Sequence, residues 1–265
     1  MTNPSFDRRN EEEAEAARHD RLYSELAASR SLAMHASDWE RFDETPQPWR
    51  PYESLVRMLG AIKGKRILDA GCGDGWLSVI LAKRGAIVDG FDISPSAIKF
   101  AQDRAAINGV GNGCTFRAAS AYDLPYPEAE FDGVIGSAIL HHLGDKQRFA
   151  RELRRVMKPG AVAVFQEPFG NSLVLERFRT FVPVPSMSPD DPDQWKQQFK
   201  YGDLKPFEKH FRVQVKEYHL LSRLDRVIPP GRTLTFLERL DRRILASFPF
   251  LRRYARTVLL RLEPL

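Results

Sequence analysis

Three glycines at alternating positions, between a strand-like and a helix-like segment, constrain the fold of this chain most strongly. Gly71, Gly73 and Gly75 follow the apolar run "RILDA" (66–70) and precede "WLSVILAKRG" (76–85), which we interpret as a helix. Glycine is needed where a backbone takes a positive φ or lies against a ligand without a Cβ. Because the free N–H groups of a helix amino terminus follow the glycines, this loop can hold electronegative ligand atoms.

The same alternation of strand and helix continues along the chain. We predict further strands at 86–93, 114–119, 131–137 and 161–168. Ser94 is expected to be the N-cap of a helix that runs to about residue 108, and a second helix is expected to stop at Pro159-Gly160. Strands that alternate with helices predict an α/β fold, with a doubly wound parallel sheet covered on both faces.

Both ends of the chain differ from this central pattern. Residues 1–20 are highly charged and are expected to be frayed at their start, followed by a helix from about 11 to 37. We divide the chain into an N-terminal tail and helical cap at 1–50 and one domain at 51–265. The segments 168–205 and 222–250 are expected to be insertions that shape an acceptor site. A helix at 233–250 is expected between two late strands, 210–221 and 255–263.

A carboxylate downstream of the glycines narrows the choice of ligand. Asp92 ends the next apolar run, 17 residues after Gly75, where it can accept hydrogen bonds from both hydroxyls of a ribose. A dinucleotide-binding loop would read G-x-G-x-x-G, but the third glycine comes one position early, and no Gly-Lys-Ser/Thr of a phosphate loop follows. Asp69, just before the glycines, favours a cationic ligand such as S-adenosylmethionine (SAM), which carries an ammonium and a sulfonium.

The segments from about 52 to 168 resemble class I SAM-dependent methyltransferases. "LDAGCGDG" is similar to their first motif, "VDGFDIS" to the ribose-binding acid motif, and "AASAYDLPYPEAEFDGVIGSAILHHL" to the third and fourth motifs. "ELRRVMKPGAVAVFQEP" is similar to the segment around the fifth strand, and the agreement is best with the methyltransferase type 11 branch, which methylates quinones and small molecules. The resemblance implies a Rossmann-like, seven-stranded sheet with an antiparallel last strand, and SAM as cofactor with S-adenosyl-L-homocysteine as product.

The resemblance also implies roles for the residues of the glycine loop. The backbone of Gly71, Cys72 and Gly73 would lie along the methionine part of SAM, and Asp69 would lie near its ammonium. Ala70 belongs to the same cofactor-binding segment.

Further cofactor contacts would come from the loops after the second and third strands. Asp92 would accept from the ribose hydroxyls, and Ile93 would lie against the adenine. Ala121, Tyr122 and Asp123 would flank the adenine edge, with Asp123 accepting a hydrogen bond from its exocyclic amine.

The segment after the fourth strand is expected to contribute to chemistry. Ser137 and Ala138 would lie near the sulfonium, and His141 and His142 follow. Either histidine can be a general base for an acceptor that must lose a proton, or both can be structural; His142 is the preferred base. We expect no metal, because some related quinone O-methyltransferases have two glutamates ahead of the histidine, where this chain has Ser137 and Leu140.

Aromatic residues in two segments suggest an apolar acceptor. Those after the fifth strand would line a pocket or lid, or form the small core of a long excursion, and those near residue 45 would close over the cofactor from the other side. The first set is Phe169, Phe178, Phe181, Trp195, Phe199 and Tyr201; the second is Trp39, Phe42 and Trp49.

Charge and composition limit the partners. Residues 212–265 hold 12 Lys+Arg against 5 Asp+Glu, which favours a solvated helix face or an anionic partner. The helix at 233–250 has an apolar stripe beside arginines. It is expected to pack on the sheet, and peripheral membrane contact is the less favoured interpretation. We find no signal peptide, no membrane-length apolar run and no cysteine framework, and therefore expect a cytoplasmic protein.

The sequence therefore predicts an enzyme that transfers a methyl group from SAM to a small-molecule or lipid-like acceptor, with O-methylation favoured. C- or N-methylation of a quinone or natural-product intermediate is the alternative. An RNA methyltransferase is less favoured and no nucleic acid is expected, because no RNA-binding module or Asn/Asp-Pro-Pro-Tyr motif is present. A SAM-binding protein without catalytic activity is the non-enzymatic alternative.

Overall fold

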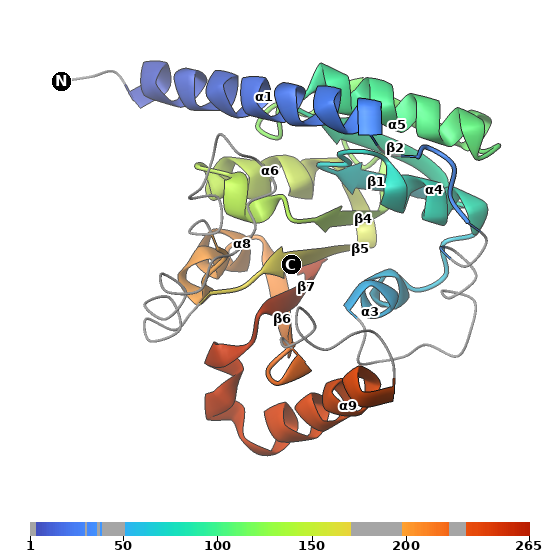
Figure 1. Ribbon diagram of the computed structural model, residues 1–265. Coiled ribbons are helices and arrows are strands. Elements are labelled where there is room, and N and C mark those ends of the chain that lie inside the picture. Colours follow the sequence, from blue (N-terminus) through green and yellow to red (C-terminus); the bar gives the residue numbers. More distant parts are fainter. Residues whose placement is uncertain (1–3, 30, 36–37, 39–50, 171–197, 223–231) are drawn as a thin grey trace.

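A seven-stranded mixed sheet, in the order β3-β2-β1-β4-β5-β7-β6, is the centre of the structure (Figure 1). The structure is a computed structural model that describes residues 4–29, 31–35, 38, 51–170, 198–222 and 232–265. β7 is antiparallel to both of its neighbours, β5 and β6, which confirms the expected antiparallel last strand. The strands are β1 (Arg66–Ala70), β2 (Ile87–Asp92), β3 (Cys114–Ala118), β4 (Phe131–Ser137), β5 (Met157–Pro168), β6 (Phe211–Tyr218) and β7 (Thr257–Pro264).

Helices alternate with the parallel strands and cover the sheet. Ser94 is the N-cap of α5, as expected, and its hydroxyl accepts the N–H of Ala97. Figure 1 shows α1 alongside α5 on one side of the molecule and α9 at the other end, near β6. The α-helices are α1 (Pro4–Ser29), α3 (Pro51–Met58), α4 (Trp76–Lys83), α5 (Pro95–Ile107), α6 (Lys146–Val156), α8 (Lys205–Glu208) and α9 (Arg232–Ser247); the 3-10 helices are η1 (Gly111–Gly113), η2 (Leu140–His142), η4 (Tyr201–Leu204) and η6 (Pro249–Tyr254).

The burial of the strands explains their sequence patterns. β1 and β4 lie in the middle of the sheet, and most of their residues are buried, as expected for parallel strands covered on both faces. β6 is an edge strand, in which buried or half-buried residues alternate with exposed ones. The alternation of "FRVQVKEY" therefore follows from its position at the edge of the sheet.

Expected boundaries were wrong in two regions of the chain. Pro159-Gly160 does not end a helix, because α6 ends at Val156 and β5 begins directly at Met157. The pairing of β4 with β5 shifts register after the Phe131–Met157 pair, so these residues form an irregularity within the strand. At the amino terminus, α1 begins at Pro4 and ends at Ser29, whereas we expected a frayed start and a helix from 11 to 37.

The side chain of Asn108, the C-cap residue of α5, accounts for the early end of α1. The Asn108 side chain accepts the N–H of Met34 at 2.9 Å and donates to the carbonyl of Leu32 at 2.9 Å. These contacts use backbone groups that a continuing helix would bond internally. The helical pattern after Ser29 is therefore overridden by a tertiary contact.

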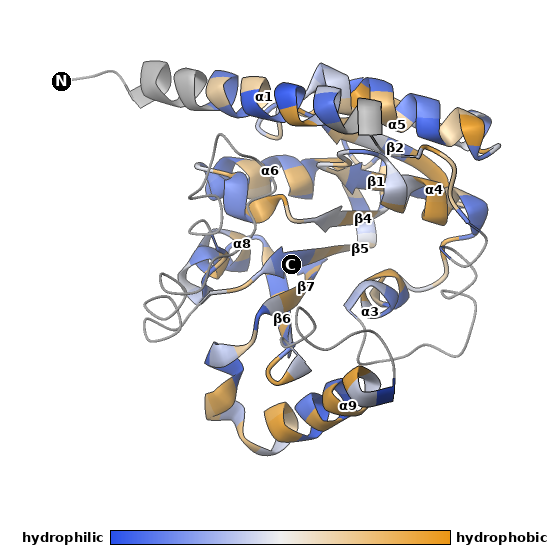
Figure 2. Ribbon diagram, viewed as in Figure 1, coloured by the Kyte–Doolittle hydropathy of each residue, from blue (hydrophilic) through white to orange (hydrophobic). Residues whose placement is uncertain are grey.

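A buried carboxylate of helix α9 binds the segment that follows β6. Asp241 accepts the N–H groups of Leu220, Leu221 and Ser222 at 2.7–2.9 Å, and also the Ser222 hydroxyl. Leu245 is the other buried residue of α9, and Figure 2 shows hydrophobic and hydrophilic residues interspersed along the helix. Leu234, Leu237, Leu240 and Ile244 are only half-buried, so the expected burial of the apolar stripe is partial. No helix of the described ranges has both the length and the apolar character that a membrane crossing requires.

We predict that Gly75→Ala destabilises the protein much more than Gly109→Ala. Both glycines have φ near +70°, so alanine adds about 1 kcal/mol of backbone strain at either position. At Gly75 the new Cβ would also lie 2.7 Å from the Ala101 Cβ and 2.9 Å from its Cα, whereas at Gly109 no heavy atom lies within 4 Å. The expected losses of unfolding free energy, measured in urea, are about 3 and about 1 kcal/mol. Equal losses would contradict the close packing of α4 on α5.

Candidate functional site

The segments singled out in the sequence meet at the carboxyl ends of the parallel strands. β1, β2, β3 and β4 are parallel, so their carboxyl ends lie on the same side. In open α/β sheets, ligands bind in the crevice outside these ends, where the strand order reverses. Here the order reverses between β1 and β4. The candidate site is therefore built from the loops that follow these four strands.

The glycine loop after β1 is fixed to the end of β2 through Asp92. Its two carboxylate oxygens accept the N–H groups of Gly73 and Ser94, each at 3.0 Å. Gly71 and Gly73 have φ of +64° and +50°, and a Cβ at Gly71 would lie 2.8 Å from the Ile139 side chain. The loop therefore needs glycine both for its conformation and for its close packing. Burial raises the pKa of Asp92 above its usual range.

Asp69 is buried beside the same loop. Its carboxylate accepts the hydroxyl of Ser78, on α4, at 2.6 Å. Only 2% of the residue is exposed, and burial raises the pKa of its carboxyl to about 7. Neighbouring Asp74 and Asp92 raise the pKa further, because a second negative charge is unfavourable nearby. An acid in this state favours a nearby cation, since a cation would stabilise its ionised form.

The loop after β3 presents residues of different exposure. Ala121 is buried in the main core, Tyr122 is half-buried and Asp123 is exposed. The Tyr122 hydroxyl accepts the N–H of Asp145, and the Tyr122 N–H donates to the Ser120 hydroxyl. Tyr122 therefore joins this loop to the start of α6, whereas the side chain of Asp123 is exposed to solvent. Ile93, after β2, is half-buried.

The segment after β4 contains a strained residue. Ala138 has φ of +59°, a left-handed conformation that a non-glycine residue rarely adopts. Its N–H donates to the carbonyl of Gln166 at 2.8 Å, which holds the turn in place. The neighbouring Ser137 hydroxyl lies 3.3 Å from the hydroxyl of Tyr52 on α3. Strain of this kind often accompanies functional sites.

His141 is held by a carboxylate that the sequence analysis did not single out. Glu167, at the end of β5, is fully buried and accepts the N–H groups of Ile139, Leu140 and His141. The Nδ1 of His141 lies 2.7 Å from Glu167 Oε2. The signal for Glu167 was its position at the carboxyl end of a strand whose other residues are mostly apolar. These contacts favour the structural interpretation of His141.

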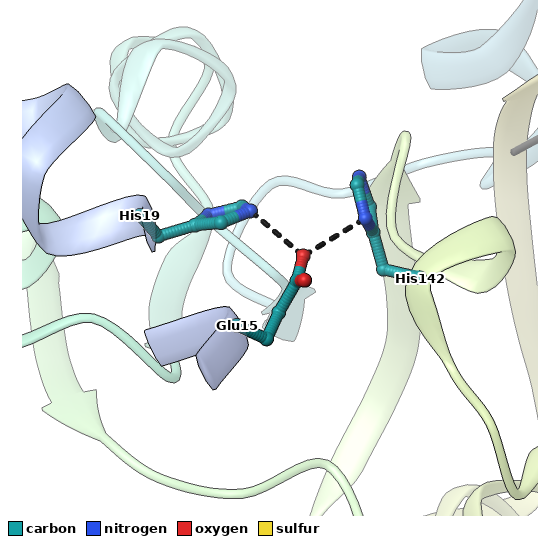
Figure 3. Close-up of side chains that lie close together, drawn as sticks. All are labelled: Glu15, His19 and His142. Atoms are coloured by element: carbon teal, nitrogen blue, oxygen red, sulfur yellow. Dashed lines mark ion pairs between the residues drawn. The ribbon is translucent and has the colours of Figure 1, made fainter. Parts of the chain in front are cut away.

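His142 forms a different cluster, with two residues of α1 (Figure 3). Its Nδ1 lies 2.9 Å from Glu15 Oε1, and His19 Nε2 lies 3.1 Å from the same oxygen. Burial lowers the pKa of His142, although the hydrogen bond to Glu15 opposes this effect. For Glu15, burial is outweighed by hydrogen bonds from His142, His19 and Arg18, which hold its pKa well below the usual range.

The donor atoms of Glu15, His19 and His142 all lie within 4.8 Å of one another, as in some metal sites. However, Arg18 donates to both carboxylate oxygens of Glu15 and lies 3.5 Å from His142 Nδ1. A guanidinium therefore already supplies the positive charge that a metal ion would bring. We interpret the cluster as an ion-pair network, and the expectation of no metal stays a prediction.

Helix α1 contacts loops along the whole candidate site, which the sequence did not reveal. Its Glu12 accepts the hydroxyl of Ser120 after β3, and its Asp20 accepts the hydroxyl of Ser94 and the N–H of Ser96 after β2. Tyr23 lies so close to the loop after β1 that a Cβ on Gly73 would collide with its hydroxyl. Together with the contact to the segment after β4, α1 reaches the loops after all four strands.

The aromatic residues after β5 are core residues where the structure describes them. Phe169 and Phe199 are each 1% exposed, and the Phe169 ring lies 4.9 Å from that of Tyr201. This confirms the core interpretation for these three residues. The other six aromatic residues, at 39, 42, 49, 178, 181 and 195, lie outside the described residues.

This sheet order, with a glycine loop after β1 and an acid after β2, defines the chain as a class I α/β methyltransferase fold. Residues 68–165 match the family model described as a methyltransferase domain. The chain is similar to the O-methyltransferase rstn1 of Aspergillus nomiae, with 30% identity over 168 residues that cover 60% of this chain and 75% of that protein. It is also similar to ajmaline N-methyltransferase of Rauvolfia serpentina, with 39% identity over 103 residues, or 38% of this chain and 35% of that protein.

Among solved structures, the fold is similar to that of geranyl diphosphate C-methyltransferase from Streptomyces coelicolor A3(2), in complex with Mg²⁺, geranyl diphosphate and S-adenosyl-L-homocysteine. The TM-score is 0.57 at 16% identity, over 80% of this chain and 78% of that one. The chain thus spans about a third of one curated relative and three quarters of the other. It belongs to the SAM-dependent methyltransferases, and SAM is its cofactor.

The residues at the candidate site fit this cofactor. The positive-φ glycines leave the backbone after β1 without side chains, as a ligand lying along it requires. Buried Asp69 has a raised pKa, which a cation would lower, and each oxygen of Asp92 can accept a hydrogen bond beyond the one it receives from the backbone.

Proposed function

We propose that this protein is a methyltransferase that transfers the methyl group of SAM to a small-molecule or lipid-like acceptor, with a hydroxyl oxygen as the favoured acceptor atom. The preference for oxygen rests on the buried His142, which lies in the segment after β4. Its pKa is lowered by burial, so that it is neutral near pH 7 and can accept a proton. A hydroxyl must lose a proton on methylation, whereas many amines are already nucleophilic without a base.

We further propose roles for the site residues. Gly71, Cys72 and Gly73 would hold the methionine part of SAM, and Asp92 would accept from its ribose hydroxyls. The adenine would lie between Ile93 and the loop 121–123. SAM supplies a methyl group on a positively charged sulfur, so the chain has to align the acceptor, exclude water and take up the proton.

Additional proposed contacts involve four residues. Asp69 would stabilise the ammonium, Ala70 would support the loop from the end of β1, and Ser137 and Ala138 would lie near the sulfonium. The strained turn at Ala138 supports this placement, because it holds the backbone after β4 in one conformation.

We predict that SAM binding weakens as the pH falls below 7, because of Asp69. With a carboxyl pKa of about 7 in the free protein, Asp69 must lose a proton to pair with the ammonium below this pH. The dissociation constant is therefore expected to rise up to about tenfold per pH unit between pH 7 and 5, and to be nearly constant above pH 7.5. Calorimetry over this range would measure it.

Asp69→Asn is the control for this prediction. Asparagine can still accept the hydrogen bond of Ser78, so we expect weaker binding with a flat pH profile. A flat profile for the wild-type protein would contradict the proximity of Asp69 to the ammonium.

Incubation with methyl-labelled SAM and a cell extract would test the proposed function. Label in the organic-solvent extract supports a small or lipid-like acceptor. Label in RNA would support the less favoured RNA methyltransferase, and SAM binding without transfer to either fraction would support the non-catalytic alternative. Mass spectrometry of the labelled product would then distinguish methylation of oxygen from that of nitrogen or carbon.

A further inference from the structure

We propose that Glu15 of α1 is a positioning residue for His142, and that the base is complete only when α1 lies across the site. This inference rests on the proposed function, because it assigns His142 the task of taking a proton from the acceptor. Glu15 lies outside the methyltransferase motifs, 127 positions before His142 in the sequence.

The hydrogen bond between the two residues determines the form of the imidazole. Ionised Glu15 can only accept, so His142 Nδ1, at 2.9 Å, must carry the hydrogen. In the neutral ring, Nε2 then has the free lone pair, and in Figure 3 this second nitrogen lies on the side of the ring away from Glu15. A proton that leaves an acceptor hydroxyl would go to Nε2, while Glu15 stabilises the positive charge that forms on the ring.

The neighbouring His141 shows why the origin of the carboxylate matters. Its partner, Glu167, is part of the sheet and also binds three backbone N–H groups, so that pair is fixed by the core. The partner of His142 comes from a helix outside the sheet. The His141 pair therefore stays formed as long as the domain is folded, whereas the Glu15–His142 pair depends on the position of α1.

The way α1 is attached is consistent with such a dependence. Besides Glu15, Arg18 and His19, which face His142, the described contacts of α1 to the site loops also come from polar side chains, namely Glu12, Asp20, Ser24 and Tyr23. Figure 2 shows many hydrophilic residues along this helix. Polar contacts near solvent are weaker than an apolar interface, so α1 can leave the site without disruption of the core. Because α1 contacts all four loops, a movement of α1 away from the site would separate Glu15 from His142.

The other groups that face His142 determine the expected effect of removing the carboxylate. On α1, Arg18 lies 3.5 Å from Nδ1, and the His19 ring lies 5.5 Å away. On η2, the His141 ring lies 4.0 Å away. All three disfavour a charged imidazolium when they carry positive charge. Without the charge of Glu15, His142 is therefore expected to lose its fixed tautomer and to bind a proton less readily.

Nuclear magnetic resonance of ¹⁵N-histidine-labelled protein tests the pairing without an acceptor. The His142 signals are assigned by their loss in His142→Gln. In the wild-type protein we expect Nδ1 to carry the hydrogen in the neutral ring. In Glu15→Gln we expect the pKa of His142 to fall by about one unit and the Nε2–H tautomer to become populated. Glu13→Gln makes the same charge change on an exposed side chain of α1, and should leave the His142 signals unchanged.

The kinetic readout follows once an acceptor is known. We expect Glu15→Gln to lower kcat about tenfold or more, to leave the dissociation constant of SAM within twofold, and to shift the pH profile of kcat in parallel with the pKa of His142. Glu15→Ala, which cannot donate or accept, should show the same NMR changes. Far-ultraviolet circular dichroism would confirm that both variants retain the helix content of the wild type.

The results separate this inference from the proposed function. If the His142 signals titrate identically in wild type, Glu15→Gln and Glu15→Ala, the positioning role is wrong, whatever the activity. An unchanged kcat for Glu15→Gln also overturns it. If the NMR changes occur but no methyl transfer is found in any fraction, the pairing is supported and the proposed function fails.

Discussion

Asp92→Ala is expected to weaken SAM binding about a hundredfold or more. The carboxylate would lose two charge-assisted hydrogen bonds to the ribose, each worth about 1.5 kcal/mol or more, and about 3 kcal/mol corresponds to a hundredfold change in the dissociation constant. The loop would also lose the acceptor that fixes the N–H of Gly73. Calorimetry with SAM and with S-adenosyl-L-homocysteine would measure the effect, which should be similar for both because they share the ribose.

A carboxylate at the other end of the strands, where their amino ends lie, provides a matched control. Asp132, near the amino end of β4, accepts the backbone N–H of Arg66 at 2.9 Å, a contact of the same kind. Asp132→Ala also removes an acceptor of a backbone N–H, but it should leave the affinity for SAM within twofold. Wild-type affinity in Asp92→Ala, on folded protein, would contradict the assignment of the site.

His142→Gln is expected to lower kcat about a hundredfold, because general-base catalysis by a positioned side chain contributes at least this much. SAM affinity should change little, since the proposed cofactor contacts lie on other residues. If the acceptor is a phenol, the loss should become smaller as the pH approaches the phenol pKa of about 10, because the acceptor then ionises without a base. Single-turnover transfer of labelled methyl groups between pH 6 and 10 would measure this.

His141→Gln separates a base from a structural residue. His141 pairs with fully buried Glu167, so its replacement should lower stability by about 2 kcal/mol through the contact it removes. We expect kcat of the surviving folded protein to fall less than in His142→Gln. If His141→Gln abolishes transfer and His142→Gln does not, the choice of base is wrong.

The regular part of the fold could be predicted because local patterns and tertiary packing agree there. β1 and β4 have the expected bounds, because buried parallel strands read as short apolar runs between polar segments. The start of α5 is likewise local, since Ser94 caps the helix that Pro95 begins. The position of β5 was less well predicted, because Pro159-Gly160 resembles a helix stop but lies within the irregular start of a strand.

The candidate site could be predicted only as far as the loops of the sheet. The glycines and Asp92 have a local signature, because a side-chain-free turn and an acid after adjacent strands are needed at fixed places in the chain. Glu167 has only a weak signature, and Glu15 has none. Glu15 lies in the acidic run "EEEAEAARHD", at the start of the helix that we expected from about 11 to 37, but nothing in this run indicated that α1 would lie along α5 and place the residue against His142.

From the sequence, hydrophobic periodicity predicted the α/β sheet, whereas the antiparallel last strand and the methyltransferase family were implied by the resemblance of the motifs from about 52 to 168. The glycine loop and the acid after the second strand indicated the proposed cofactor site, because only particular residue types meet the backbone requirements of such a loop. The tertiary structure alone decided which carboxylate each histidine meets, and that α1 covers the loops after β1 to β4. Such contacts join separate elements, as Glu15 of α1 meets His142 of η2 and Glu167 of β5 meets His141, and a single charged side chain leaves no periodic pattern that would reveal its partner.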